Sequence, residues 1–124
     1  EVLVATGGTA TSLIAMNAKL EPYDPSFVHL RGISLEDVQK LEGLLAGMTV
    51  KERAELPGLQ EKRAPVILRG TITLFELIRA TGFNTMIASE SDLLFGLVIT
   101  AAAVYEGRES PVVWRPILKP LTKK

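Results

Sequence analysis

The chain has 124 residues, 47% of them hydrophobic and 23% charged, and its 14 lysines and arginines balance 14 acidic side chains. This length and composition fit one globular domain and argue against a disordered segment. The zero formal charge removes the usual electrostatic case for nucleic acid or an anionic membrane surface, so we expect neither partner.

Cysteine is absent from the chain, which excludes disulfides, thiolate metal sites and a cysteine nucleophile. Its absence fits a reducing compartment, so we expect a cytoplasmic protein. The first residue is Glu1, and a strand-like run follows at once without the basic region of a signal peptide. We therefore expect the chain to be a piece of a longer protein.

The first predicted elements are a strand and a helix joined by two glycines. Residues 2–6 are a short apolar run closed by the glycine pair, and residues 9–20 place apolar side chains at helical spacing. Residues 21–33 contain two prolines, which argue against a regular helix at the start of this segment. Within it, residues 27–33 could form a short extended segment.

Capping patterns predict the helices of the middle of the chain. Ser34, with an acid three residues later, starts an amphipathic helix. The pattern Thr-x-x-Glu at 49–52 is a capping box that starts a short helix. Residues 61–81 form the longest helical pattern, in which Pro65 is tolerable only in the first turn, and Gly82 ends it.

A second strand and an apolar helix are predicted after that glycine. Residues 84–90 read as a buried strand, and Ser91-Asp92 caps the following helix. The longest apolar run, residues 93–105, falls short of the roughly 20 residues needed to cross a bilayer, so we expect a buried helix and no membrane partner. Prolines keep the apolar tail, residues 108–124, extended.

These elements predict a helix-rich α/β fold with two or three strands and about five helices. We assign residues 1–107 to one domain and residues 108–124 to the extended tail. A sheet of so few strands is marginal by itself, so missing chain or a neighbouring copy is expected to complete it. Because an open sheet edge beside an apolar tail favours self-association, we also consider a homodimer.

The turn between the first strand and helix, residues 5–11, is the most specific local feature. Unpaired N–H groups at a helix start, with no Cβ to keep a ligand away, are suited to a phosphate. The alternative is that the glycines only allow a tight turn and that Thr9 or Thr11 caps the helix. Arg63, a cation at a predicted helix start, either is solvated or faces a bound anion.

Structural explanations are favoured for the other polar and glycine positions. The carboxylates of residues 89–92 would repel a phosphate unless a metal lay between them, and helix capping explains them better. His29 is the single histidine and has Asp24 nearby, but no Gly-x-Ser-x-Gly motif presents a nucleophile to it. Gly70 and Gly96 inside helices permit close packing or the approach of a flat ligand.

Four segments, taken together, resemble the Ppx/GppA family of exopolyphosphatases and guanosine pentaphosphate phosphohydrolases, within the actin-like ATPase superfamily. The segments are residues 6–13, Tyr23-Asp24 with Val28-His29, residues 52–59 with Arg63-Ala64, and Ser89-Glu90 with Leu93 and Gly96. The run from Glu52 to Ala64 is the most distinctive. The likeness covers residues 1 to about 107 and implies the C-terminal part of the family's second actin-like, ribonuclease H-like domain.

The resemblance implies that the parent protein hydrolyses terminal phosphoanhydrides of polyphosphate or guanosine pentaphosphate, with Mg²⁺ and an upstream catalytic carboxylate. This chain would form one wall of the interdomain substrate cleft. Gly7, Gly8 and Thr9 would lie near the phosphates, with Arg63 as a further phosphate-binding candidate. It implies no catalytic residue and no metal ligand on this chain, which alone would be inactive.

Departures from the family pattern leave two other functions open. Ser91-Asp92 replaces two glycines, Leu94-Phe95 replaces a charged pair, Leu30 replaces a glycine and Pro65 replaces an aspartate. The more acidic junction favours a binding or regulatory module that kept the fold and lost the chemistry. Another branch of the superfamily, such as a kinase, is the remaining alternative.

Overall fold

A computed structural model describes residues 1–109 of the chain. Residues 1–92 form one compact unit, and a second unit begins at Leu93. The extended tail expected from the prolines falls almost wholly on residues 110–124, outside the described residues. Its assignment as a separate segment stays a prediction.

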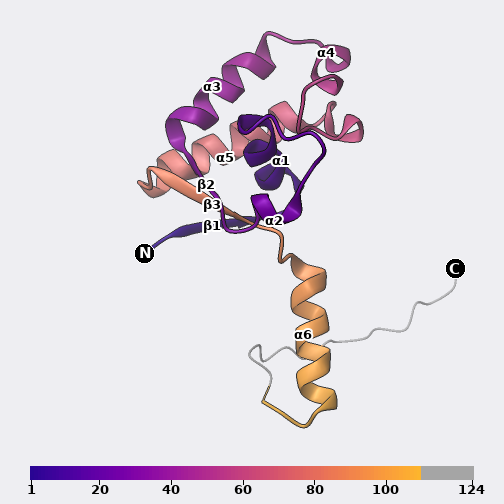
Figure 1. The fold of residues 1–124 in the computed structure, drawn as a ribbon. Coiled ribbons are helices and arrows are strands. Elements are labelled where there is room, and N and C mark those ends of the chain that lie inside the picture. The colour runs from indigo at the N-terminus through magenta and orange to yellow at the C-terminus, as the bar shows by residue number, and fades with distance from the viewer. Residues whose placement is uncertain (110–124) are drawn as a thin grey trace, which may run out of the picture. The chain divides into compact units, whose positions relative to one another are not determined.

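A three-stranded mixed sheet organises the first unit (Figure 1). Its strands are β1 (Leu3–Thr6), β2 (Gly32–Ser34) and β3 (Thr85–Ser89), in the spatial order β1-β3-β2. β3 runs parallel to β1, with the last residues of the two strands opposite one another, and antiparallel to β2. Both predicted strands are confirmed. The possible third strand is present as β2, but it is shorter than the predicted segment 27–33: it begins at Gly32 and ends at Ser34.

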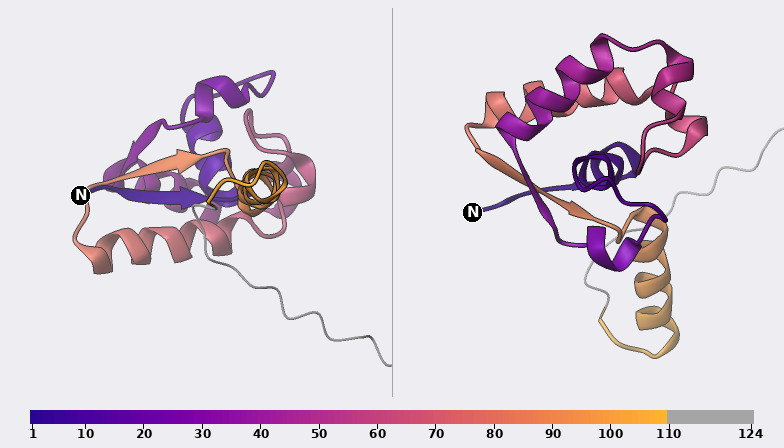
Figure 2. Two further views of the ribbon diagram at one scale, coloured as in Figure 1. Left: turned by 90° about the horizontal axis from the view of Figure 1, so that it is seen from below. Right: turned by 45° about the horizontal axis from the view of Figure 1, so that its top comes forward.

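Residues 1–109 contain six α-helices and one short 3₁₀ helix, which confirms the helix-rich α/β class. They are α1 (Gly8–Asn17), α2 (Pro25–Val28), α3 (Leu35–Ala46), α4 (Val50–Ala54), η1 (Glu61–Arg63), α5 (Ile67–Thr81) and α6 (Leu93–Tyr105). α1 packs against α3, α5 and β3, and Figure 2 shows α3 and α5 running side by side over α1. This central place explains why every residue from Ala10 to Met16 is buried.

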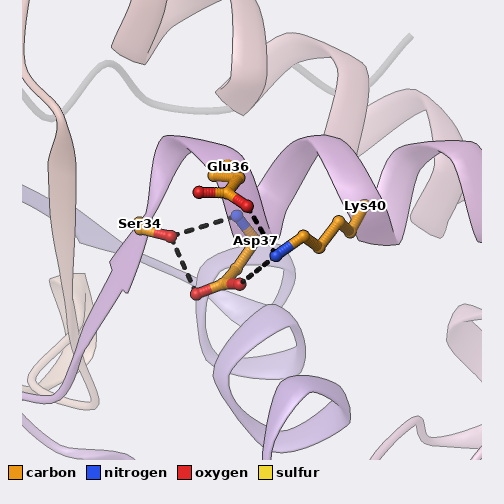
Figure 3. Close-up of polar contacts among 4 residues, drawn as sticks. All are labelled: Ser34, Glu36, Asp37 and Lys40. Atoms are coloured by element: carbon orange, nitrogen blue, oxygen red, sulfur yellow. Dashed lines mark hydrogen bonds and ion pairs between the residues drawn. The ribbon is translucent and has the colours of Figure 1, made fainter.

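The capping patterns fold as the sequence predicts. The Ser34 hydroxyl accepts a hydrogen bond from the Asp37 N–H at 3.0 Å and donates one to the Asp37 carboxylate at 2.7 Å (Figure 3). Lys40, one turn further on, forms ion pairs with Glu36 at 2.8 Å and with Asp37 at 3.5 Å. The capping box at Thr49 has both of its reciprocal hydrogen bonds.

Two prolines act differently from expectation. The predicted helix over residues 61–81 is interrupted, because Pro65 has no N–H to donate to the carbonyl four residues earlier. The chain therefore forms η1, turns, and starts α5 at Ile67. The prediction that prolines prevent a helix at the start of residues 21–33 was wrong for α2, where Pro25 occupies the first helical position and Asp24 caps it.

The expectation of a buried C-terminal helix is wrong for α6. Leu93 is 86% exposed and Phe95 is 56% exposed, and Ala103 is the one buried residue of this helix. The reason is that an all-apolar helix buries its sides only where other elements cover them. Within residues 93–109 α6 is the sole helix or strand. Across the part of the chain that the structure describes, no helix combines the length and apolarity needed to span a bilayer.

Candidate functional site

A pocket lies at the carboxyl ends of β1 and β3. Because these neighbouring strands are parallel, the loops that follow them leave the sheet at the same edge, where α/β proteins commonly bind ligands. The pocket encloses about 170 Å³. Its lining comes from four segments of the first unit, which include loops, the start of α1, η1 and the end of β3. The lining residues are Gly7, Gly8, Thr11, Ser12, Tyr23, Gly58, Gln60, Arg63, Ser89, Glu90 and Asp92.

The glycine pair opens the pocket at the N-terminus of α1. Gly7 precedes the helix with φ 98° and ψ 162°, a conformation that favours glycine because a Cβ strains it. No side chain accepts a hydrogen bond at this cap, so neither Thr9 nor Thr11 caps the helix. The Thr11 hydroxyl instead donates to the Gly8 carbonyl at 3.5 Å. The first N–H groups of a ten-residue helix thus lie at the pocket without a side-chain acceptor.

Arg63 lies directly over this helix start. A Cβ placed on Gly8 would overlap the guanidinium group, so the glycine is what lets the two groups approach. Arg63 is partly buried, and its Nε donates to the Gln60 side-chain oxygen at 3.4 Å. A cation beside the positive end of a helix dipole is electrostatically repelled by it. An anion bound between the guanidinium and the helix start would attract both and so offset that repulsion.

The end of β3 and the loop after it contribute Ser89, Glu90 and Asp92 to the pocket lining, and hydrogen bonds hold Glu90 in place. The Tyr23 hydroxyl donates to the Glu90 carboxylate, and the Glu90 N–H donates to His29 Nδ1 at 3.2 Å. The Ser89 hydroxyl oxygen accepts from the N–H two residues later at 3.1 Å. Asp24 accepts hydrogen bonds at the start of α2, so it serves there as a cap and not as a partner of His29.

The titration of Tyr23 reflects its surroundings. Partial burial, followed by the hydrogen bond and charge of Glu90, raises the pKa of Tyr23 above its ordinary value, while Thr11 and Arg63 act in the opposite direction. The phenol is therefore protonated at neutral pH and acts as the donor to Glu90. The pocket accordingly contains a tyrosine hydroxyl, one guanidinium and carboxylate groups at fixed positions.

A further part of the pocket lining comes from the loop after α4. Gly58 has φ 85°, and a Cβ there would overlap the backbone of Ala15 in α1. α4 ends at Ala54, shortly before the Pro57-Gly58 turn, and Gly58 seats the loop against the central helix. This contact brings Gln60 and Arg63 to the pocket.

The structure brings together three of the four residues that the sequence assigns to phosphate binding. Gly7, Gly8 and Arg63 line the same pocket. Thr9 lies outside it and lines a neighbouring hollow of about 300 Å³ together with Gly70. A Cβ on Gly70 would lie 2.6 Å from the Thr9 side chain, which identifies close helix packing as the reason for this glycine. A Cβ on Gly96, in contrast, meets nothing within 4 Å.

Several lining residues were not assigned a role from the sequence. Tyr23 and Glu90 lie in segments that carry the family resemblance. The resemblance therefore marks both residues, but it does not predict the hydrogen bond between them. Gln60 and Ser12 carried no local signal. Among residues 1–109 no group of three or more histidines and carboxylates could hold a metal ion, so these residues do not fit a metal site.

Comparison with known proteins gives close relatives, although no family model matches the chain. Exopolyphosphatase 2 of Mycobacterium tuberculosis is 34% identical over 103 residues, which cover 80% of this chain and 32% of that protein. The bifunctional 3-dehydroquinate synthase/phosphatase of Fusobacterium nucleatum is 32% identical over 97 residues, which cover 78% of this chain and 14% of that protein. The chain thus spans about a third or less of the curated relatives that it matches.

Solved structures of the Aquifex aeolicus Ppx/GppA family member share the fold. One matches with a TM-score of 0.81 at 24% identity, covering 88% of this chain and 36% of that one. The type II variant matches with a TM-score of 0.70 at 26% identity, covering 73% of this chain and 30% of that one. The helix-rich α/β unit is therefore an architecture already seen in that solved protein.

Proposed function

This chain belongs to the Ppx/GppA phosphatase family, and from that premise we propose that it forms one wall of the interdomain substrate cleft of a phosphohydrolase. The intact protein would cleave terminal phosphoanhydrides of polyphosphate, or of guanosine pentaphosphate. In this proposal residues 1–107 are the C-terminal part of the second actin-like domain. The relatives named as an exopolyphosphatase and as a phosphatase support this reaction class.

The observation that carries the proposal is the junction of Gly8 and Arg63. The free N–H groups at the start of α1 and the guanidinium that covers Gly8 supply donors and positive charge at one point of the pocket. A phosphate oxygen accepts hydrogen bonds from both kinds of donor. These residues bind and orient the phosphate chain. The water-activating carboxylate and Mg²⁺ belong, in this proposal, to the rest of the protein.

A binding measurement tests the role of this chain. Tripolyphosphate is titrated into the 124-residue chain by calorimetry at low salt, with Arg63→Gln as the test variant. Arg69→Gln is the matched control, because Arg69 is exposed on α5 and does not line the pocket. We expect Arg63→Gln to weaken binding about tenfold, as a charge-assisted hydrogen bond of ~1.4 kcal/mol predicts, and the control to weaken it much less. Equal losses in both variants would contradict the proposal.

Turnover provides a second test. Because the proposal assigns bond cleavage to the rest of the protein, the chain alone should release no phosphate from polyphosphate in the presence of Mg²⁺. Measurable Mg²⁺-dependent release by the purified chain would refute this division of roles.

A binding or regulatory module that lost the chemistry is the second candidate function. The acidic lining favours it, since Glu90 and Asp92 oppose an incoming phosphate chain. The sequence encoded before Glu1 distinguishes the two. Two intact glycine-rich phosphate loops with a glutamate between them favour the enzyme, and their decay favours the module. Binding of ATP and phosphoryl transfer to a sugar would indicate a kinase instead.

A further inference from the structure

The pocket holds a cation and a carboxylate that do not pair with each other. Arg63 and Glu90 both line it, yet no ion pair joins these two residues. Each is bound elsewhere: Arg63 Nε donates to Gln60, and the Glu90 carboxylate accepts from the Tyr23 hydroxyl. A guanidinium and a carboxylate sharing a small pocket would normally attract one another, so something holds them apart.

The segment that contains Tyr23 and His29 holds Glu90 at two points. The Tyr23 hydroxyl binds the end of its side chain, and His29 Nδ1 binds its backbone N–H at 3.2 Å. Tyr23 and Glu90 are 67 positions apart in the sequence, so this contact is formed only in the folded chain. The His29 contact fixes where the side chain starts, and the Tyr23 contact fixes where it points.

We propose that Tyr23 is a positioning residue that holds the Glu90 carboxylate away from Arg63 and so keeps the guanidinium available to a phosphate anion. The proposal rests on the proposed function of the pocket. Without the phenol hydroxyl, the carboxylate loses its hydrogen-bond donor and turns toward Arg63, which is the only basic side chain among the described residues that line the pocket. The pocket then neutralises its own cation, and a phosphate must displace a carboxylate in order to bind.

The test is a set of variants of the 124-residue chain titrated with tripolyphosphate at low salt. Tyr23→Phe removes only the hydroxyl and should weaken binding about fivefold, the factor that corresponds to an ion pair of ~1 kcal/mol. Tyr105→Phe is the matched control, because Tyr105 is 92% exposed on α6 and does not line the pocket. Circular dichroism and urea unfolding verify that each variant is folded.

Rescue separates positioning from a direct contact between Tyr23 and the anion. Glu90→Gln keeps an acceptor for the tyrosine but removes the charge. The gain in affinity from Glu90→Gln should be at least threefold larger in the Tyr23→Phe background than in the parent chain, and the double variant should recover the parent affinity. An equal gain in both backgrounds, or no loss in Tyr23→Phe, would overturn the inference.

A ligand-free structure decides the inference even if the chain fails to bind tripolyphosphate. In crystals of the Tyr23→Phe variant we expect the Glu90 carboxylate within ion-pair distance of Arg63. A carboxylate that stays in its parental position overturns the inference, whatever the binding data show. Absence of binding by the parent chain would instead count against the proposed function.

Discussion

Gly58 offers a sharp test of how the pocket wall is built. Two independent features require glycine there: a positive φ of 85°, and contact with the α1 backbone so close that a Cβ would overlap Ala15 and lie 2.7 Å from the Met16 nitrogen. The obstacle is main chain of a buried helix, which cannot rotate away as a side chain could. Gly58→Ala must therefore strain the turn and push the loop off α1.

The magnitude follows from adding the two costs. A non-glycine residue in the left-handed region costs about 1–2 kcal/mol, and overpacking against a well-packed interior costs about 1–3 kcal/mol. The free energy of unfolding should therefore fall by about 2–5 kcal/mol. Because the displaced loop also carries Arg63, the affinity for tripolyphosphate should fall in the same variant.

Two other glycines serve as matched controls. Gly82 has a positive φ of 75° but an added Cβ meets nothing within 4 Å, so Gly82→Ala should show only the backbone cost of about 1–2 kcal/mol. Gly43 lies inside α3 with open space around it, and Gly43→Ala should stabilise the chain by up to about 1 kcal/mol through helix propensity.

Urea unfolding monitored by circular dichroism gives all three values, with the slope checked for two-state behaviour. The expected order of stability is Gly43→Ala, parent, Gly82→Ala, Gly58→Ala. If Gly58→Ala unfolds within about 0.5 kcal/mol of Gly82→Ala, the close contact with α1 contributes nothing and the reasoning fails.

Further predictions concern caps and helix packing. Thr49→Ala removes the hydroxyl that accepts the Glu52 N–H and should lower the free energy of unfolding by about 1 kcal/mol; an unchanged urea midpoint would show that the cap is not stabilising. Gly70→Ala places a methyl group against Thr9 and should cost about 1–3 kcal/mol, part of which Thr9→Ala in the same chain should restore; strictly additive effects would contradict the contact. Hydrogen bonds from Thr49 lower the pKa of Glu52, so this carboxylate stabilises the fold above its unfolded pKa of about 4.3 and loses that effect as the pH falls through the lower folded value. The stability difference between the parent and Glu52→Gln should therefore shrink on acidification, and a difference that is constant with pH would exclude this linkage.

Local signals sufficed for much of the fold. The caps at Ser34 and Thr49 and the helix end at Gly82 are each defined by a few adjacent residues, so the sequence alone predicts them. The short helix α2 was missed although Asp24 and Pro25 form a cap followed by a proline at the first helical position. Proline breaks a helix in its interior but is favoured at the first helical position, so only its place relative to the cap decides which role it takes.

The exposure of α6 and the contacts of the pocket could not be predicted in this way. The composition of an apolar helix indicates that its sides should pack against other elements, but it does not show which segment of the protein they pack against. Likewise, the glycine pair and Arg63 were each recognisable, yet the overlap between Gly8 and the guanidinium depends on where η1 lies against α1. The contact between Tyr23 and Glu90 joins positions 67 residues apart, and no local pattern encodes it.

The sheet order has a consequence for how the chain acquires its structure. β3 lies between β1 and β2, although it is the last of the three strands to be synthesised. Among the strands that the structure describes, β1 and β2 pair only with β3, so these pairings cannot form until Thr85–Ser89 emerges from the ribosome. Pairing β1 with β3 must then close a loop of most of the first unit. Such long closures are slow, so a nascent chain arrested before Thr85 should lack both of the pairings that β3 makes and should leave the edges of β1 and β2 that face β3 open to chaperones or to other chains.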